Sequence, residues 1–389
     1  MLSREDPRFF ARWRCVTGAT ERDPMAVFVT HSVFREPGWS RLHPLSGNRQ
    51  AAVIDICEML QWFDEDHVRL CDFASRETLT AFHDADYVDA VRDASASGQV
   101  SADVRTRYHI GTMENPVFER VFERAAASVG GAIEAARCAL DHGCAYHPAG
   151  GTHHGKRAEA SGFCYFNDPV FAVQTLIDSG ATPVLYVDID AHHGDGVEIA
   201  FADHPDVVLI STHESGRWPH TGAGDGASPA NAHNFPLPRG VNDSEFMFLI
   251  DGPISEIAAQ TKPKSVVIVA GADCLDGDPL SAMALSNIGF WDAIDRIRSF
   301  APTQVILGGG GYNPWTTVRA WAGLWGRLAG FDLPHSLPPA AQEKLEAMSC
   351  DLIDTEDMRP EWTTTLCDQP NRGPIRDEVK ELARARVVA

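Results

Sequence analysis

Five residues that can ionise or bind a metal stand within eight positions of the sequence. They are Asp188, Asp190, His192, His193 and Asp195, and they directly follow the apolar residues 185–187. A buried strand would therefore carry them into the interior. Carboxylates removed together from water need compensation by opposite charges or bound cations. The cluster indicates a chemical site rather than a requirement of the fold.

The spacing of Asp188, Asp190 and His192 predicts a metal site. Alternate residues of a strand project to one side, so these three share a face if strand geometry persists to its end. A carboxylate and an imidazole can both reach zinc at ~2.0–2.2 Å. Asp273, in GADCLDGDP (271–279), is the best candidate for a third ligand from another strand end. Three protein ligands leave one position open, as in catalytic rather than structural zinc sites.

Two further segments supply acid–base and hydrogen-bonding groups. His153 and His154 follow a glycine pair in GGTHHGKR (150–157). Asp188 and Asp195 can pair with these rings, fix their tautomers and raise their basicity. Tyr312 closes GGGGYN (308–313), where a phenol hydroxyl can stabilise an oxyanion. Each feature alone has a plain structural explanation, but one catalytic site explains all of them together.

Parallel strands are the elements that would position these residues. Apolar, β-branched runs alternate with helical stretches, which predicts one α/β domain with a mostly parallel sheet and helices on both faces. Each run ends in His, Asp or Gly, and open α/β sheets bind ligands at the carboxyl ends of their strands. The six runs cover residues 25–31, 144–151, 184–190, 207–213, 266–273 and 304–311.

The helix pattern is clearest between two of these runs. Residues 116–143 are predicted to form one helix, with Asn115 as its cap, Pro116 in its first turn and Gly143 at its end. Near the C-terminus, residues 376–387 are amphipathic and are interpreted as a helix packing on the same domain, with a mobile tail as the alternative. Residues 1–24 are expected to be an N-terminal extension, and 25–389 one domain.

Composition narrows the class of protein. The 389 residues carry a net charge of −21, which argues against binding nucleic acid or anionic membranes through general electrostatics. No apolar run reaches ~18 residues, so no transmembrane helix is expected, and the charged N-terminus lacks the apolar core of a signal peptide. Nine scattered cysteines without a C-x-x-C pair favour reduced thiols and a cytoplasmic location.

Four motifs in order resemble the zinc-dependent histone deacetylase superfamily: GGTHHGKRAEASGFCYFND, YVDIDAHHGDGVEIAF, GADCLDGDP and ILGGGGYN. Within it, the chain is most similar to bacterial deacetylases of the acetoin-utilisation type, which are related to class I histone deacetylases. Residues 110–136 support that branch, and the resemblance runs from about residue 25 to 330. It implies an arginase/deacetylase-like fold and metal-dependent hydrolysis of acyl-lysine.

The resemblance also implies roles for individual residues. Zinc would lie on Asp190, His192 and Asp273, polarise the amide carbonyl and acidify a bound water. His154, paired with Asp195, would be the general base. The protein partners expected from this chemistry are acyl-lysine proteins or peptides, or small acylated amines.

Other positions would support that chemistry. The resemblance pairs His153 with Asp188 for electrostatic help and gives Tyr312 the substrate carbonyl oxygen. It also implies a structural potassium ion near the zinc, held with the help of Asp188, Ser211 and Thr212.

The substrate-binding positions depart from the family pattern in places. Phe163 would line the acyl-lysine tunnel together with Gly162. Trp218 stands where a second tunnel Phe is usual, so it can narrow the entrance or shift acyl preference. Glu114 replaces an Asp that grips the substrate backbone at the rim, and Thr152 replaces a larger apolar residue before the histidine pair.

Three competing functions fit the sequence less well. A binuclear arginase-like site needs a carboxylate where the chain has Gly194, and acetylpolyamine deacetylases place an acidic residue at the position of Leu280. The first is therefore disfavoured strongly and the second less so. A catalytically silent acyl-lysine-binding module would lack a metal ligand, the base or the tyrosine, and all are present.

Overall fold

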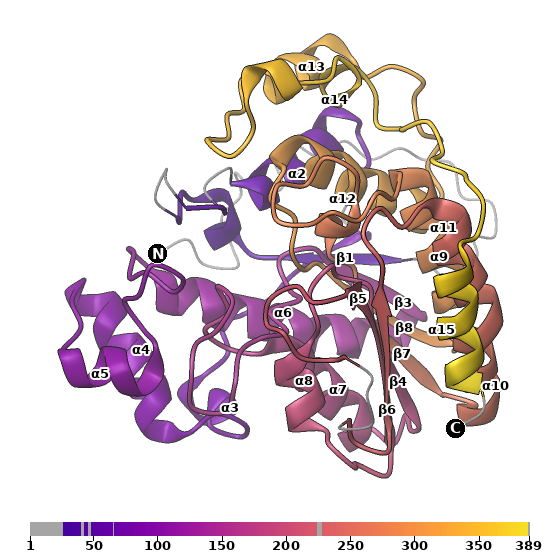
Figure 1. Cartoon of the computed structure of the whole chain (residues 1–389). Helices are drawn as coiled ribbons and strands as arrows, with labels where there is room; N and C mark the ends of the chain where they lie inside the picture. Colours follow the sequence, from indigo (N-terminus) through magenta and orange to yellow (C-terminus); the bar gives the residue numbers. More distant parts are fainter. Residues whose placement is uncertain (1–25, 40–42, 46–47, 65, 224–227, 388–389) are drawn as a thin grey trace.

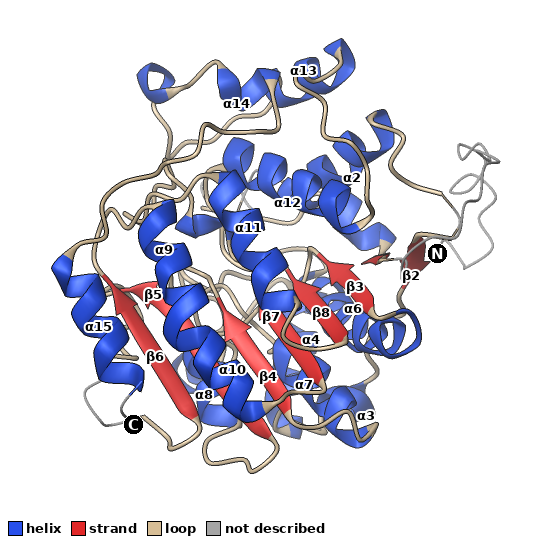
Figure 2. Cartoon of the chain, turned by 90° about the vertical axis from the view of Figure 1, so that its right-hand side faces the viewer, coloured by secondary structure: helices blue, strands red, loops and turns tan. Residues whose placement is uncertain are grey.

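An eight-stranded, entirely parallel sheet lies at the centre of the computed structural model, which describes residues 26–39, 43–45, 48–64, 66–223 and 228–387 (Figure 2). The spatial order of the strands is β2-β1-β3-β8-β7-β4-β5-β6. Their bounds are β1 (Val27–Thr30), β2 (Val68–Leu70), β3 (Cys144–His147), β4 (Val184–Asp188), β5 (Val207–Glu214), β6 (Ala232–Leu237), β7 (Ser265–Val269) and β8 (Thr303–Leu307).

Helices cover both faces of the sheet, which confirms the predicted single α/β domain. Figure 2 shows α9, α10 and α11 in front of the sheet and α6, α7 and α8 behind it. Side chains of β4 alternate accordingly, since Val184 and Tyr186 pack with α6 and α7 while Leu185 and Val187 face the opposite core. The bounds are α2 (Arg49–Met59), α6 (Val121–His142), α7 (Asp168–Asp178), α8 (Asp195–Ala200), α9 (Asp243–Leu249), α10 (Ser255–Thr261), α11 (Asn287–Arg298) and α12 (Pro314–Leu328).

Smaller elements surround this core (Figure 1). The C-terminal helix α15 lies beside β6 and contacts α9, the π-helical turn η2 and β6 itself. None of the helices within the described ranges is long and apolar enough to cross a membrane. The remaining bounds are η1 (Ser32–Arg35), α3 (Arg76–Leu79), α4 (Ala85–Ser97), α5 (Ala102–Tyr108), η2 (Ile250–Ile254), η3 (Ala272–Cys274), α13 (Pro339–Glu346), η4 (Thr355–Asp357), α14 (Glu361–Thr364) and α15 (Asp377–Val387).

All six predicted strands are present, as β1, β3, β4, β5, β7 and β8. The sequence did not predict β2 and β6, which form the two ends of the sheet. β2 is only three residues long, and β6 contains Pro236 and the half-buried His233. An edge strand is covered less completely and tolerates proline, so it lacks the continuous apolar run of a central strand.

The predicted helix over residues 116–143 begins later than expected. α6 starts at Val121 after Arg120, which adopts a left-handed conformation, while Gly143 ends the helix as predicted. Asn115 does not cap α6, because its Oδ1 accepts a hydrogen bond from the Phe163 N–H at 3.0 Å instead. The predicted N-terminal extension, residues 1–24, lies outside the described residues.

The order of the strands creates a crevice for a ligand. From β4 the chain continues to β5 and β6 at one end of the sheet, whereas β7 is followed by β8 on its other side. β4 and β7 are neighbours, so the loops that leave their carboxyl ends diverge at this point. Such a topological switch point is where open α/β sheets bind ligands.

Candidate active site

The chain turns sharply after β4, at the start of the acidic cluster. β4 ends at Asp188, so strand geometry does not persist through Asp190 and His192, which was the condition for the three side chains to share a strand face. Asp188 Oδ1 accepts the Asp190 N–H at 3.1 Å, and Asp190 Oδ1 accepts the His192 N–H at 2.9 Å. Two successive turns closed by aspartate side chains replace the strand. They nevertheless leave Asp190 and His192 side by side.

Asp190, His192 and Asp273 form a buried cluster of possible metal ligands. One ligand atom from each lies within 4.8 Å of the other two. His192 Nδ1 is 3.1 Å from Asp190 Oδ1 and 2.9 Å from Asp273 Oδ2. The other oxygen of each carboxylate accepts a hydrogen bond from the backbone. Asp190 Oδ2 accepts the Gly310 N–H at 2.6 Å, and Asp273 Oδ1 accepts the Ala191 N–H at 2.8 Å. The cluster is thus tied to loops that follow β4, β7 and β8.

This donor set fits a divalent cation. Burial acts to lower the pKa of His192, but hydrogen bonds and charges of Asp190 and Asp273 outweigh it and raise the pKa to about 10. A proton on the ring therefore balances part of the carboxylate charge when no metal is bound. Two carboxylates and one imidazole converge here, with no fourth protein ligand among the residues that the structure describes, and they match the donors that catalytic zinc takes.

Two histidine–aspartate pairs lie beside the cluster, as the sequence predicted. His153 Nδ1 is 2.7 Å from Asp188 Oδ2, His154 Nδ1 is 2.7 Å from Asp195 Oδ1, and the two ring centroids are 3.9 Å apart. The Tyr186 hydroxyl also donates to Asp188 Oδ2 at 2.6 Å. Each imidazole is therefore held by a hydrogen bond at its Nδ1 atom, which leaves its Nε2 atom available for acid–base chemistry.

The two imidazoles differ in protonation. Burial opposes a proton on His153, but the charges of Asp188 and Asp190 prevail and raise its pKa to about 9. Burial and then the charge of His153 lower the pKa of His154 to about 3. At neutral pH the first ring holds a proton and the second has a free lone pair on Nε2. Neighbouring groups with opposite shifts are the usual signature of an acid–base site.

Asp168 anchors the loop that carries the histidine pair, although the sequence pattern did not single it out. Its Oδ2 accepts the Gly151 N–H at 2.9 Å, and its Oδ1 accepts the Thr152 N–H at 2.8 Å. The Thr152 hydroxyl donates toward the same carboxylate and the Phe166 carbonyl, so a polar residue here has specific partners. Burial raises the pKa of Asp168 to about 6. The sequence signal for it is Asn167-Asp168-Pro169, a typical helix start, which overlaps the end of the GGTHHGKRAEASGFCYFND motif.

Tyr312 reaches the cluster from the glycine loop after β8. Its ring lies edge-on to His192, with centroids 6.1 Å apart, and 5.8 Å from the ring of Phe163. Burial raises the pKa of Tyr312 well above its usual value, so its hydroxyl stays a hydrogen-bond donor. The buried Arg49 donates hydrogen bonds to the Gly309 and Gly311 carbonyls at 2.9 and 2.5 Å and so supports the glycine loop. Arg49 is distant from this loop in the sequence, so the contact was not predicted.

A pocket of about 890 Å³, here called the outer pocket, opens onto these residues. Its lining includes His154, His192 and Tyr312, together with all five predicted substrate-binding residues: Glu114, Gly162, Phe163, Trp218 and Leu280. The Trp218 ring lies edge-on to His154 at 4.6 Å. Glu114 Oε1 accepts the Gly162 N–H at 2.5 Å, so this carboxylate is bound to the pocket wall.

Gly162 and Phe163 form the tightest part of the wall. Both have positive φ, +54° and +67°, which is unusual for phenylalanine. A Cβ at position 162 would lie 2.4 Å from the His154 ring and 2.5 Å from Trp218. Only glycine therefore fits between the general-base candidate and the tryptophan.

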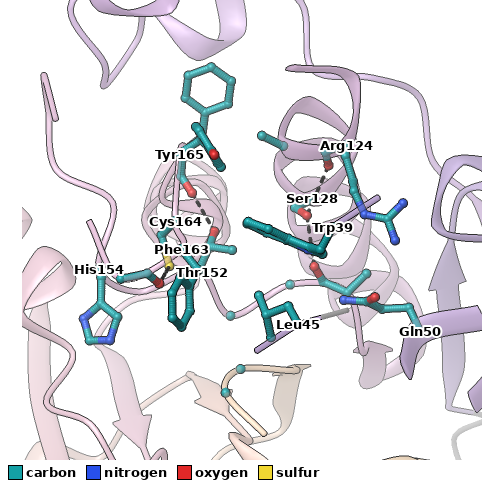
Figure 3. Close-up of a pocket in the computed structure, with 18 of the residues that line it drawn as sticks. Trp39, Leu45, Gln50, Arg124, Ser128, Thr152, His154, Phe163, Cys164 and Tyr165 are labelled. Carbon is teal, nitrogen blue, oxygen red and sulfur yellow. Dashed lines mark hydrogen bonds between the residues drawn. The ribbon is translucent and has the colours of Figure 1, made fainter. Parts of the chain in front are cut away.

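A second, smaller cavity of about 90 Å³, here called the inner cavity, shares wall residues with the outer pocket, and no sequence pattern indicated it. Figure 3 shows His154 and Phe163 on one side of it and Trp39 and Arg124 on the other. His153 and Tyr312 also line this inner cavity, so it meets the outer pocket at the predicted site.

Ser211 and Thr212, predicted to help hold potassium, lie on β5 next to the end of β4. Ser211 is paired in register with Asp188, and the Thr212 hydroxyl donates to the Asp188 carbonyl at 3.2 Å. The Ser211 hydroxyl lies 2.9 Å from His213 Nδ1. The three residues are thus adjacent, and their role toward a cation stays a prediction.

Comparisons with known proteins agree with the geometry. Residues 43–328 match the histone deacetylase domain. Acetoin utilization protein AcuC of Bacillus subtilis (strain 168) is 36% identical over 330 residues, 81% of this chain and 84% of that protein. Histone deacetylase 8 of Danio rerio is 36% identical over 273 residues, 68% of this chain and 72% of that protein.

Solved structures are similar over nearly the whole chain. The crystal structure of an HDAC homolog from Aquifex aeolicus has a TM-score of 0.89 at 31% identity, covering 93% of this chain and 100% of that one. That of an HDAC homolog complexed with SAHA has a TM-score of 0.87 at 32% identity, covering 94% and 100%.

Proposed function

Because this chain belongs to the histone deacetylase family, we propose that it is a zinc-dependent amidohydrolase that removes acetyl or related acyl groups from the Nε atom of acyl-lysine. One observation carries the proposal. Asp190, His192 and Asp273 bring ligand atoms within 4.8 Å of one another, beside two histidine–aspartate pairs and at the outer pocket.

The three buried ligands would hold the zinc ion. When bound there, it supplies Lewis-acid activation of a carbonyl group and of a water molecule. We further propose that Asp188, Ser211 and Thr212 help to hold a potassium ion, which is supported by their adjacency across β4 and β5. Its charge would offset the Asp188 carboxylate, which already serves His153.

The chain's own residues perform the proton transfers. His154 is neutral, donates from Nδ1 to Asp195, and accepts the proton of the attacking water at Nε2. His153, held at Nδ1 by Asp188, lies beside the reacting atoms, and a histidine N–H returns a proton to the leaving amine nitrogen. The Tyr312 hydroxyl donates to the amide oxygen as that oxygen gains negative charge.

The outer pocket favours acyl-lysine over acylated polyamines. Phe163, Trp218 and Gly162 form the walls through which a lysine side chain would pass. A polyamine needs a free carboxylate near the entrance, whereas Leu280 is apolar. Among the described lining residues, Glu114 is bound to the Gly162 N–H and Glu214 is paired with Arg217 at 2.6 Å.

Acetate release tests the proposal directly. Zinc-loaded protein is incubated with an acetyl-lysine peptide or with N-acetylputrescine, each with and without a chelator. Chelator-sensitive turnover of the peptide is expected. Turnover of acetylputrescine alone would replace lysine by a polyamine as the substrate, and no turnover of either would remove both acetyl substrates from consideration.

The extent and location of the enzyme are part of the same proposal. We assign the deacetylase domain to residues 25–389, because β1 is an inner strand of the sheet and α15 packs against α9. A cytoplasmic location is supported by the eight cysteines in the described ranges, all of which are free thiols.

A further inference from the structure

The glycine loop that presents Tyr312 has no side chains of its own to fix its conformation. Residues 308–311 are all glycine, and Gly309 and Gly311 have φ of +149° and +138°, which other residues rarely adopt. Four successive glycines lose much conformational freedom when they are ordered. The position of the Tyr312 hydroxyl therefore depends on groups outside the loop.

A single buried carboxylate holds the end of this loop. Asp278 Oδ2 accepts the Tyr312 N–H at 2.6 Å and the Asn313 N–H at 3.2 Å. The Asn313 side chain returns a hydrogen bond to the Gly277 carbonyl at 3.0 Å. Two consecutive N–H groups on one oxygen fix the direction in which the backbone enters α12, and so the direction of the Tyr312 side chain.

The same carboxylate also holds the entrance of the outer pocket. Asp278 Oδ1 accepts the Leu280 N–H at 2.9 Å, and the Leu280 carbonyl accepts from Arg217 at 2.7 Å. Leu280 and Tyr312 both line the pocket. One side chain thus joins the residue at the entrance to the residue at the reacting atoms.

Burying this carboxylate without a charged partner destabilises the folded state. Asp278 is buried, and no lysine, arginine or histidine pairs with it within the described residues. Burial and the charge of Asp273 raise its pKa to about 7. A group retained at that cost, with hydrogen bonds only to pocket loops, is a candidate for a functional role.

We propose that Asp278 is a positioning residue, which sets the Tyr312 hydroxyl over the reacting carbonyl and couples that position to Leu280 at the pocket entrance. The proposal rests on the function proposed above and adds a residue to it. Asp278 itself touches no reacting atom. It acts through backbone N–H groups on both of its oxygens, so an amide in its place can satisfy only one side.

A double-mutant cycle tests whether Asp278 acts through the Tyr312 hydroxyl. Asp278→Asn should lower kcat about 10- to 100-fold with little change in KM, since misplacing a catalytic group by about 1 Å costs that much. In a Tyr312→Phe background the same change should alter kcat less than about threefold, because the hydroxyl to be positioned is gone. Asp278→Glu, which keeps both acceptors but moves them, should show the same dependence on Tyr312.

Asp243 provides a matched control for general destabilisation. It is also buried, and it accepts from the Ser286 N–H at 2.8 Å and the Asn371 N–H at 2.7 Å, on different elements. Asp243→Asn should lower the midpoint of urea unfolding without lowering kcat.

The outcomes separate the two proposals. Effects of Asp278 and Tyr312 variants that multiply independently would overturn the positioning role while leaving the deacetylase intact. The positioning role is likewise overturned if Asp278→Asn and Asp243→Asn change only stability. Wild-type protein that releases no acyl group from acyl-lysine substrates would overturn the proposed function, and this inference with it.

Discussion

In the proposed mechanism, Tyr312 is a hydrogen-bond donor that stays protonated and His154 is a base that stays neutral. Burial is the main cause in both cases, because it raises the pKa of the phenol and lowers that of the imidazole. His153, one position away from His154, has the opposite shift because Asp188 and Asp190 face it. Identical residue types thus acquire different roles from their partners alone.

Replacing the phenol tests its role. Tyr312→Phe keeps the ring and removes the hydroxyl, so kcat for an acetyl-lysine peptide should fall about 10²- to 10³-fold with little change in KM. Steady-state kinetics on zinc-loaded protein measures both constants. Equal changes in kcat and KM would mean that the hydroxyl contributes to binding rather than to the reaction.

Zinc affinity should rise with pH. In the metal-free protein Asp190 and Asp273 raise the pKa of His192 to about 10, so at neutral pH a metal must displace a proton. Each pH unit between about 6 and 8 should then increase the apparent affinity about tenfold, with about one proton released per zinc. Competition with a chelator, and an indicator dye in weak buffer, measure these quantities.

The neighbouring imidazole is the control for that experiment. His193 bonds Thr221 and Glu198, at 2.8 and 3.1 Å, rather than the metal cluster. His193→Gln should therefore leave proton release unchanged, and affinity independent of pH in the wild type would refute the competition.

At the scale of elements, the site is built by the carboxyl ends of five neighbouring strands and by the loops that follow them. The amino-terminal ends of these strands carry none of the predicted site residues. β3, β8, β7, β4 and β5 are adjacent in the sheet, and each carries predicted site residues at or after its carboxyl end. The apolar runs made these strands predictable, and the residues at their ends were named correctly as neighbours. Asp168, Asp278 and Arg49 were not, because most of their hydrogen bonds are to backbone N–H or C=O groups, which no sequence pattern displays.

The end of β3 should contribute to acid lability. His147 is buried there, its Nδ1 donates to the Val29 carbonyl at 2.9 Å, and burial lowers its pKa to about 4. The unfolded chain binds a proton near the usual value of about 6.5, so folded stability falls as pH drops from 6.5 to 4, by about 3 kcal/mol. His147→Asn should be less stable at pH 7 but lose less stability on acidification.

Urea unfolding of the metal-free protein between pH 7 and 4 measures this difference. His335→Asn, on an exposed residue, is the control and should follow the wild type. Parallel curves for His147→Asn and wild type would show that this histidine does not contribute to the acid transition.

For the whole molecule, one ion pair fastens the C-terminal helix. Glu245, fully buried on α9, accepts the Arg376 backbone N–H at 3.0 Å, and its two oxygens lie 2.6 and 2.7 Å from the guanidinium nitrogens. The amphipathic pattern predicted α15, but its docking site was not predictable, because Glu245 lies more than 100 residues earlier in the chain.

Breaking that pair should weaken the docking of α15. Arg376→Ala leaves the Glu245 carboxylate short of partners and should lower the free energy of unfolding by about 2 kcal/mol, with kcat preserved. Lys380→Ala removes an exposed pair on the same helix and should change it by less than about 0.5 kcal/mol. Urea denaturation and acetate release measure the two effects, and equal losses from both variants would contradict a special role for Arg376.

The position of α15 beside β6 also affects whether copies of the protein associate with one another. β6 is the last strand of the sheet, with β5 as its one hydrogen-bonded neighbour in the described chain. An uncovered edge strand presents unpaired N–H and C=O groups on which another chain can build, and this is a common route to aggregation. Loss of the C-terminal helix is therefore expected to appear first as aggregation in concentrated solutions, while the protein that stays in solution keeps the proposed activity.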